Sequence, residues 1–184
     1  MYEVRFHGRG GQGAVTAANI LASAAYSEGK YSQAFPIFGV ERRGAPVAAF
    51  LRVDEKPIDI KFQIYEPDAV VIQDPSLLAV KEANVRGGLK KGGKVVINTK
   101  RDPSEFDFGD AEVYAIDATG VALNNRLGTE TNPIVNTAII GAYVKVIGNI
   151  SLDAALKAVY ELSPAKRDNN VAAVKEAYEK VKGV

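Results

Sequence analysis

A glycine-rich segment near the start of the chain has the spacing of a phosphate-binding loop. The segment runs Gly8-Arg9-Gly10-Gly11-Gln12-Gly13 and satisfies the pattern G-x-G-x-x-G. Residues without a Cβ let backbone N–H groups approach a phosphate, and a helix N-terminus adds a partial positive charge that Arg9 would reinforce. The pattern alone fits two interpretations equally: an anion site, or a tight turn that only lets a helix pack closely on a sheet.

Few other side chains could do chemistry. The chain has no cysteine and one histidine, so it offers no thiolate nucleophile and no ligand set for a conventional iron–sulfur or structural zinc site. For that histidine, His7, a hydrogen-bonded structural role is favoured over catalysis. Asp74 follows an apolar run, yet Asp74-Pro75-Ser76 is better explained as a helix cap. We therefore expect no catalytic residue and no metal site in this chain, with any redox centre in other chains.

Two adjacent arginines, Arg42 and Arg43, follow Glu41 in a segment from Phe38 to Pro46 whose composition predicts a loop. A guanidinium group suits phosphate and carboxylate partners because it donates in a planar fork. Three interpretations stay open for the pair: an ion pair at a subunit interface, a ligand contact, or a solvated surface loop.

A strand and a helix must position the glycine segment. From Tyr2 to His7 apolar and polar residues alternate, which predicts a strand with one polar face that should meet something polar, such as a partner chain. Residues 14–27 are rich in Ala without a helix breaker, which predicts a helix. Ordinary NAD binding is disfavoured, because the second strand ends in Phe35-Pro36 and not in the acid that holds a ribose hydroxyl.

The remaining sequence predicts an α/β fold. Strands are expected at residues 30–35, ended by Pro36, and at 69–73, 94–98 and 112–116, with a β-hairpin at 47–53 and 57–62. Helices are expected between Asp74-Pro75-Ser76 and Gly87-Gly88, and at 118–126, 134–147, 152–162, capped by Ser151, and 171–182. This alternation predicts a three-layer α/β/α fold with a mixed, mostly parallel sheet and a Rossmann-like glycine-rich strand-to-helix turn. The 184 residues show no repeat or linker, so we expect a single domain over residues 1–184.

The overall charge disfavours some partners. Lys plus Arg number 23 and Asp plus Glu 22, so a formal charge of +1 gives no global attraction for nucleic acid or an anionic membrane. Glu3 and Arg5 interrupt the start of the chain before an apolar run could serve as a signal peptide, and Lys145 interrupts the apolar stretch of residues 139–147. We expect a cytoplasmic protein that binds neither nucleic acid nor membrane.

Several longer motifs are together more specific than the glycine loop. They are Arg9-Gly10-Gly11-Gln12-Gly13, Phe35-Pro36 with Phe38-Gly39, Glu41-Arg42-Arg43-Gly44-Ala45-Pro46-Val47, Tyr65-Glu66-Pro67-Asp68, Asp74-Pro75-Ser76, Thr131-Asn132-Pro133, Asn136-Thr137-Ala138 and Gly141-Ala142. With these motifs the chain closely resembles the gamma subunit of 2-oxoacid:ferredoxin oxidoreductases, especially the pyruvate and 2-ketoisovalerate types. The resemblance covers nearly the whole chain and is looser at residues 102–112 and in the C-terminal helix.

This resemblance implies membership of a multi-subunit oxidoreductase. The holoenzyme oxidatively decarboxylates a 2-oxoacid, transfers the acyl group to coenzyme A and passes the electrons to ferredoxin. Thiamine diphosphate and [4Fe-4S] clusters would be held by partner subunits, which are the alpha, beta and ferredoxin-like delta subunits. The present chain would be a non-redox subunit that is not catalytic alone, and the identity of the 2-oxoacid would depend on the other chains.

The resemblance also implies a coenzyme A site. In relatives the gamma component helps to form that site, and coenzyme A carries a pyrophosphate and a ribose phosphate that need N–H donors and guanidinium groups. The residues expected to contact it are Gly8, Arg9, Gly10, Gly11, Gln12, Gly13, Arg42 and Arg43. They would face a cleft shared with a neighbouring subunit. Two alternatives stay open: a stand-alone dinucleotide-binding oxidoreductase and a small-ligand binding module.

Overall fold

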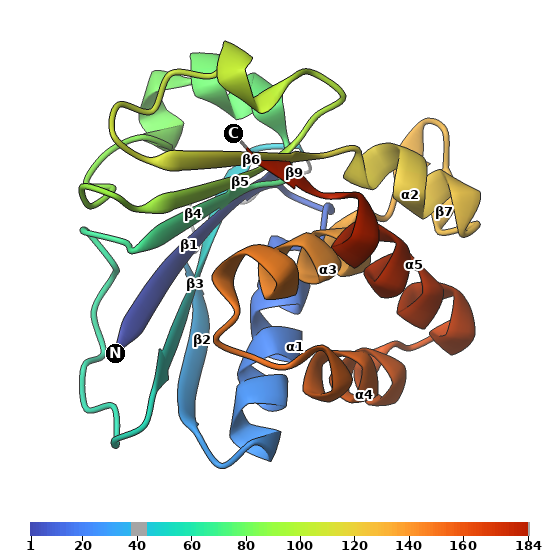
Figure 1. Cartoon of the computed structure of the whole chain (residues 1–184), viewed down its shortest axis with the longest axis horizontal. Coiled ribbons are helices and arrows are strands. Elements are labelled where there is room, and N and C mark those ends of the chain that lie inside the picture. The colour runs from blue at the N-terminus through green and yellow to red at the C-terminus, as the bar shows by residue number, and fades with distance from the viewer. Residues whose placement is uncertain (38–43, 184) are drawn as a thin grey trace.

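A seven-stranded sheet forms the centre of the structure, a computed structural model that describes residues 1–37 and 44–183 (Figure 1). The strand order is β2-β3-β1-β4-β5-β6-β9. Strand bounds are β1 Tyr2–Arg9, β2 Tyr31–Ile37, β3 Pro46–Asp54, β4 Ala69–Ile72, β5 Lys94–Asn98, β6 Glu112–Ile116 and β9 Lys182–Gly183, with β7 Gly128–Thr129 and β8 Asn132–Pro133 forming a separate pair. Only β3 and β9 run against the direction of the other strands of this sheet. The predicted mixed, mostly parallel sheet is confirmed.

The two faces of the sheet carry different layers (Figure 1). The α-helices gather on one face: α1 Ala14–Ser27, α2 Ala118–Asn124, α3 Asn136–Ile147, α4 Leu152–Leu162 and α5 Arg167–Lys180. The other face is covered by short 3-10 helices and extended segments, the 3-10 helices being η1 Pro75–Ala79, η2 Lys81–Ala83 and η3 Pro103–Glu105. The α/β fold predicted from the sequence is therefore confirmed, with its thinner layer opposite the α-helices.

Buried aliphatic side chains fill both faces of the central strands. Val71 and Val96 lie in the cluster beneath the α-helices, whereas Val70 and Val95 lie in the cluster beneath the 3-10 helices. Successive strand residues point to opposite faces, so burial on both sides explains why β4 and residues 95–97 of β5 are continuously apolar. The strand–glycine loop–helix unit begins at the centre of this sheet, on β1.

The polar face of β1 is buried within the chain itself. Arg5 is 7% exposed, and its Nη2 donates to the backbone oxygens of Asn84, Val85 and Gly87 at 3.1, 3.2 and 2.6 Å. Its Nε donates to Nε2 of His7 at 2.9 Å. Part of the polar surroundings expected for this face is therefore supplied by residues 84–87 of the same chain.

The predicted hairpin of residues 47–53 and 57–62 is wrong in its second half. β3 pairs antiparallel with both β1 and β2, so both of its edges are occupied and residues 57–62 form no strand. Arg52, which is fully buried, holds that segment instead. Its Nη2 donates to the backbone oxygen of Phe62 at 2.8 Å and its Nη1 to that of Ile60 at 3.5 Å. A buried arginine thus replaces the expected strand pairing.

The predicted helix between Asp74 and Gly87 is also wrong, because the segment forms the two 3-10 helices η1 and η2. Asp74 does cap the first, as predicted, by accepting from the Ser76 N–H at 3.0 Å. The backbone is extended at Val80 and left-handed at Asn84, which ends each turn early. The cap starts a turn, but it does not fix how far the turn continues.

Most other elements lie close to their predicted bounds, but the helix predicted at 171–182 is displaced: α5 spans Arg167–Lys180, and Lys182 belongs to β9. α4 has the predicted bounds, and Ser151 caps it by accepting from the Ala154 N–H at 3.2 Å. The prediction that Pro36 ends the second strand is wrong: β2 continues to Ile37, and the missing N–H of Pro36 is tolerated because β2 lies at the edge of the sheet. The short strand β9 is not foreseen. Among the described residues, none of the helices has the length and apolar composition needed to cross a membrane.

Candidate functional site

The glycine loop lies where the order of the parallel strands reverses. β1 and β4 are parallel neighbours; the chain leaves β1 for β2 and β3 on one side, and leaves β4 for β5 on the other. Ligands of open α/β sheets bind in the crevice beyond the carboxyl ends of strands at such a point. The residues found there are the glycine loop after β1, Asp74 after β4 and Asn98 at the end of β5.

The glycines of the loop have different structural roles. A Cβ on Gly13 would lie 2.9 Å from Asn136 Nδ2, and one on Gly8 would lie 2.8 Å from Gln73 Oε1. At these two positions the tight-packing interpretation therefore has direct support. Gly11 has a positive φ of 95°, and a Cβ there would meet nothing within 4 Å among the described atoms. The loop is therefore packed at its two ends and open at Gly11.

The first turn of α1 offers backbone donors to this opening. Gly13, in the left-handed conformation, is its N-cap and provides no side-chain acceptor, and the first turn contains no acidic residue. The first N–H groups of a helix have no acceptor within the helix, and the helix dipole favours an anion beside them. The geometry of the loop is thus suited to a phosphate or carboxylate group.

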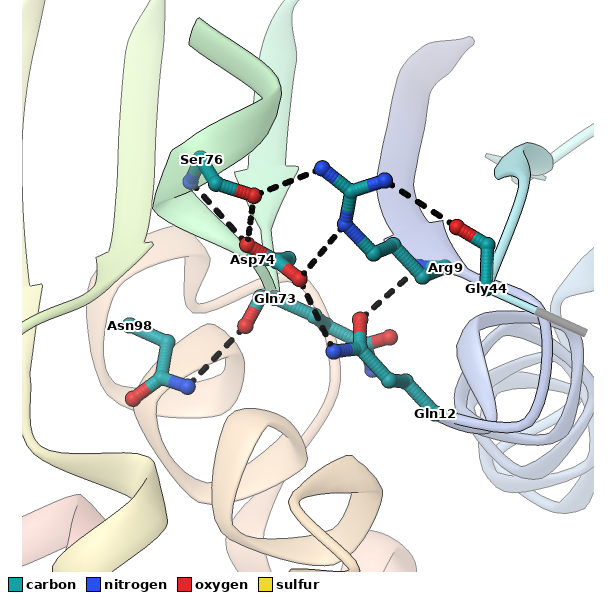
Figure 2. A network of polar contacts seen from close by, with 7 residues as sticks. All are labelled: Arg9, Gln12, Gly44, Gln73, Asp74, Ser76 and Asn98. Carbon is teal, nitrogen blue, oxygen red and sulfur yellow. Dashed lines mark hydrogen bonds and ion pairs between the residues drawn. The ribbon is translucent and has the colours of Figure 1, made fainter. Parts of the chain in front are cut away.

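Arg9 is engaged by the protein itself (Figure 2). Its Nε donates to Asp74 Oδ2 at 3.0 Å, its Nη2 to Ser76 Oγ at 2.7 Å, and its Nη1 to the backbone oxygen of Gly44 at 3.0 Å. The guanidinium charge is therefore largely compensated by Asp74. Arg9 ties the glycine loop to the end of β4 and to the segment before β3.

Gln12 and Asp74 complete this network. Gln12 Oε1 accepts from the Arg9 N–H at 2.8 Å, and Gln12 Nε2 donates to Asp74 Oδ2 at 3.1 Å. Burial alone would raise the pKa of Asp74, but hydrogen bonds from Ser76 and Gln12 and the charge of Arg9 outweigh it and hold the pKa below its ordinary value. Asp74 is thus an ionised acceptor that organises the loop.

A buried glutamine was missed by the sequence reasoning. Gln73 is 1% exposed, and neither its Nε2 nor its Oε1 has a hydrogen-bond partner among the described residues. Its backbone oxygen accepts from Asn98 Nδ2 at 2.9 Å, and Asn98 also binds Thr119, with Nδ2 and Oγ1 3.1 Å apart. The available clue was a polar residue directly after the buried run Val70-Val71-Ile72, because such positions meet at one edge of a parallel sheet.

His7 lies outside this network and is hydrogen-bonded to Arg5. Burial, and next the charge of Arg5, lower the pKa of His7 to about 3, so the imidazole is neutral and accepts from Arg5. This hydrogen bond fits the structural role predicted for it. His7 and Arg5 help to line a hollow of about 310 Å³ between β3 and residues 82–84. That hollow is separate from the glycine loop.

The expected residues Arg42 and Arg43 lie outside the described residues, so their place relative to the loop stays a prediction. The remaining expected residues, Gly8 to Gly13, come together at the carboxyl end of β1. Within residues 1–37 and 44–183, no group of three or more Asp, Glu or His side chains could hold a metal ion.

Comparison with known proteins gives consistent results. The family model described as "Pyruvate ferredoxin/flavodoxin oxidoreductase" matches residues 3–180. The chain is 55% identical over 185 residues to the "Pyruvate/ketoisovalerate oxidoreductases common subunit gamma" of Thermococcus kodakarensis, covering 98% of this chain and 97% of that protein. It is 52% identical over 183 residues to the "Pyruvate synthase subunit PorC" of Methanothermobacter marburgensis, covering 99% of this chain and 98% of that protein.

Solved structures show the same fold. The crystal structure of pyruvate oxidoreductase subunit PORC from Thermotoga maritima superposes with a TM-score of 0.84 at 35% identity, covering 99% of this chain and 97% of that one. The 2-oxoglutarate:ferredoxin oxidoreductase from Magnetococcus marinus, solved with 2-oxoglutarate, coenzyme A and succinyl-CoA bound, superposes with a TM-score of 0.75. At 16% identity, and with 30% of that chain covered, this second match supports the fold alone.

Proposed function

The chain belongs to the pyruvate ferredoxin/flavodoxin oxidoreductase family, and on that premise we propose that it is the gamma subunit of a thiamine diphosphate-dependent 2-oxoacid:ferredoxin oxidoreductase and helps to bind coenzyme A. The holoenzyme would convert a 2-oxoacid and coenzyme A to acyl-coenzyme A and CO2, with electrons passed to ferredoxin. The gamma subunits among its relatives match over almost their whole length, which supports the same role for this chain.

The composition of the chain supports placing the redox groups of the holoenzyme in other subunits. Without cysteine it lacks the usual ligands of an iron–sulfur cluster. Thiamine diphosphate and [4Fe-4S] clusters would supply carbanion stabilisation and electron transfer from the alpha, beta and delta subunits. The gamma chain would contribute binding and orientation of coenzyme A at an interface with those subunits, as a cytoplasmic and non-redox component.

The observation that carries the coenzyme A assignment is the N-terminus of α1 at the strand-order reversal. Its first turn has neither a side-chain cap nor an acidic residue, and the adjoining loop is open at Gly11. A phosphate of coenzyme A would accept hydrogen bonds from these N–H groups. Arg9 would act indirectly by holding the loop, because its guanidinium is already bound to Asp74, Ser76 and Gly44.

A charge placed in that first turn tests the assignment. Thr16 and Asn19 are both exposed on α1, so Thr16→Glu adds a carboxylate beside the proposed site and Asn19→Glu adds it one turn further along. Glu is tolerated in a first helical turn, so folding should be unaffected. In the assembled enzyme, Thr16→Glu should raise the KM for coenzyme A about tenfold through like-charge repulsion, and Asn19→Glu clearly less.

Equal KM values for the Thr16→Glu variant and the wild type would remove the α1 N-terminus from the site. Arg42 and Arg43 need their own experiment. Replacing both with Ala should raise the KM for coenzyme A in the assembled enzyme, because the guanidinium groups would bind its phosphates. An unchanged apparent affinity would exclude these two residues from the site.

A further inference from the structure

Arg5 carries a buried positive charge without a carboxylate partner among the described residues. It is 7% exposed, and its hydrogen bonds go to the backbone oxygens of residues 84, 85 and 87 and to the neutral imidazole of His7. None of the ion pairs within residues 1–37 and 44–183 includes Arg5. A guanidinium charge is costly to bury unless an opposite charge lies beside it. The described part of the chain thus leaves this charge without an anion.

His7 provides a hydrogen-bond donor next to this charge. Its Nε2 accepts from Arg5 Nε at 2.9 Å, so the neutral ring carries its proton on Nδ1. The ring is neutral because burial, and next the charge of Arg5, lower the pKa of His7 to about 3. Among the described residues, the hydrogen bond to Arg5 is the only one that the His7 ring makes. An anion that reaches Arg5 therefore has a second donor beside it.

A hollow of about 310 Å³ opens at this pair of residues, because a small side chain lies between larger ones. Ala48 on β3 pairs with His7 of β1 on one side and with Ile37 of β2 on the other, so the three side chains project from the same face of the sheet. The walls are largely apolar, with Val47, Phe50, Ile64 and Ala83 among the lining residues. The hollow suits a carboxylate on a short apolar stem.

Exposed aromatic side chains lie beside the hollow. Tyr65 lines it and is 66% exposed. Phe62, three residues earlier in the chain, is 61% exposed although the Arg52 guanidinium lies over its ring. Aromatic residues are enriched in the cores of protein–protein interfaces, where they surround the anchoring contacts and exclude water. The surroundings of the hollow therefore resemble an interface more than an idle surface.

We propose that this hollow receives an Asp or Glu side chain of a neighbouring subunit, whose carboxylate pairs with Arg5 and accepts from the Nδ1–H of His7. Arg5 Nη1 is available for it, since the hydrogen bonds of Arg5 to described residues use Nε and Nη2. The inference rests on the proposed function only in placing the chain within a multi-subunit enzyme. Charge complementarity selects an acid as the anchor, because a buried guanidinium gains most from an opposite charge that is itself removed from water.

Ala48→Leu tests the contact because it fills the hollow without removing a polar group. Leu adds apolar contacts, so the free full chain should unfold at the same temperature or higher. The assembled enzyme is diluted serially and followed by native mass spectrometry. The variant chain should dissociate at a concentration about tenfold higher or more than the wild-type chain. Ala172→Leu, at an exposed alanine on α5, is the matched control and should dissociate like wild type.

A small carboxylate probes the same contact without any substitution. 2-Methylpropanoate has a carboxylate on a short apolar stem, and 2-methylpropanamide has nearly the same shape without the charge. His7 is the only histidine of the chain, so its imidazole gives a single set of NMR signals. In the free full chain the carboxylate should shift these signals saturably, and the amide clearly less. In the assembled enzyme, at equal ionic strength, the carboxylate should promote dissociation of the chain and the amide should not.

Glu82→Gln tests the sign of the partner's charge. Glu82 is the only carboxylate among the described residues that line the hollow, and it is exposed. Its removal should leave the complex as stable as before or make it more stable, because a charge that repels the incoming carboxylate is lost. Weaker association of Glu82→Gln would show that a cation of the neighbour pairs with Glu82, and it would overturn the proposal.

The outcomes separate this contact from the coenzyme A site. Wild-type dissociation of the Ala48→Leu complex would overturn the proposal. A shift of the His7 signals by 2-methylpropanoate, with no effect of that probe on the complex, would assign the hollow to a free carboxylate and equally overturn it. The competition by 2-methylpropanoate decides the question if Ala48→Leu lowers the unfolding temperature. An unchanged coenzyme A KM in Thr16→Glu, together with weakened assembly in Ala48→Leu, would reject the coenzyme A assignment and support the subunit contact.

Discussion

Asp74 shows how one carboxylate can organise a loop without taking part in chemistry. It accepts from the Ser76 N–H, from Gln12 and from Arg9, which come from the two strand ends on either side of the crevice. The matching arrangement at Asp102 is a simple cap, in which Asp102 accepts from the Ser104 N–H at 3.0 Å without any link to the glycine loop. The two residues thus provide an internal comparison.

Asp74→Ala should lower the free energy of unfolding by about 1–2 kcal/mol, because Arg9 and Gln12 lose their shared acceptor along with the cap. Asp102→Ala should lower it by less. Urea unfolding of both variants measures the difference, and equal losses would show that the network around Asp74 adds nothing to stability.

His7 makes the free energy of unfolding depend on pH, and the direction of this dependence follows from its pKa. Its pKa falls from 6.5 to about 3 in the folded protein, first through burial and then through the charge of Arg5. The unfolded chain therefore binds a proton at this histidine more readily than the folded protein does. The stabilising contribution of neutral His7 is fully present above the unfolded pKa and is lost as the pH falls from 6.5 toward 3.

His7→Gln should flatten this dependence, since Gln Oε1 can accept from Arg5 without titrating. The measurement is the free energy of unfolding at several pH values within that window, for wild type and variant. A constant difference in the free energy of unfolding between wild type and variant, at every pH measured, would contradict the predicted pH dependence.

At the scale of elements, Arg52 is the residue that fastens the irregular segment 57–62. It donates to Glu3 Oε1 at 2.8 Å and to the backbone oxygen of Phe62 at the same distance, and its guanidinium lies over the rings of Phe35 and Phe62. The arginine is fully buried, so removing its guanidinium takes the donor away from all of these acceptors at once.

Arg52→Leu should destabilise the fold by about 3–5 kcal/mol, because the Glu3 charge and two backbone oxygens lose their donor. Proteolysis should then begin within residues 55–65. Arg167→Leu, at an exposed arginine on α5, serves as control and should leave the cleavage pattern unchanged. Cleavage elsewhere first would show that the segment is held by other contacts.

Elements whose pattern is local could be predicted from the sequence, and those that depend on distant partners could not. The alternation in β1 and the capped run of α4 contain their own periodicity, so both were found. Residues 57–62 look like a strand, but β1 and β2 already occupy both edges of β3. The segment after Asp74 begins with a local cap, but its turns end at Val80 and Asn84, where the backbone leaves the helical conformation.

In the candidate site, too, the residues with a local pattern could be predicted and those brought in by distant contacts could not. The glycine loop was recognisable because its spacing is local. Gln73 and the start of α3 were not, because only the fold brings them beneath Gly8 and beside Gly13. A residue's contribution to a crevice between strands depends on strand order, which a single sequence does not state.

At the scale of the whole molecule, the proposed subunit should be active only as part of the assembled complex. Affinity purification of the tagged full chain from its natural source should recover a thiamine-containing protein and a cysteine-rich, cluster-bearing protein. Decarboxylation of a 2-oxoacid that depends on coenzyme A should follow that complex, and the separated chain should have none. Turnover by the chain alone, or recovery of a lone NAD-binding monomer, would contradict the assignment.

The two edges of the central sheet restrict how such a complex can be built. On one side β2 contains Pro36, which lacks an N–H, and on the other side the last strand, β9, is short and spans Lys182–Gly183. In the part of the chain that is described, neither edge therefore offers a long, uninterrupted row of backbone donors and acceptors for another polypeptide. Neighbouring subunits would have to dock by side-chain complementarity on faces and loops. Replacing this chain with the corresponding subunit of a relative should therefore succeed only where the surface residues match, whatever the strands at the sheet edges.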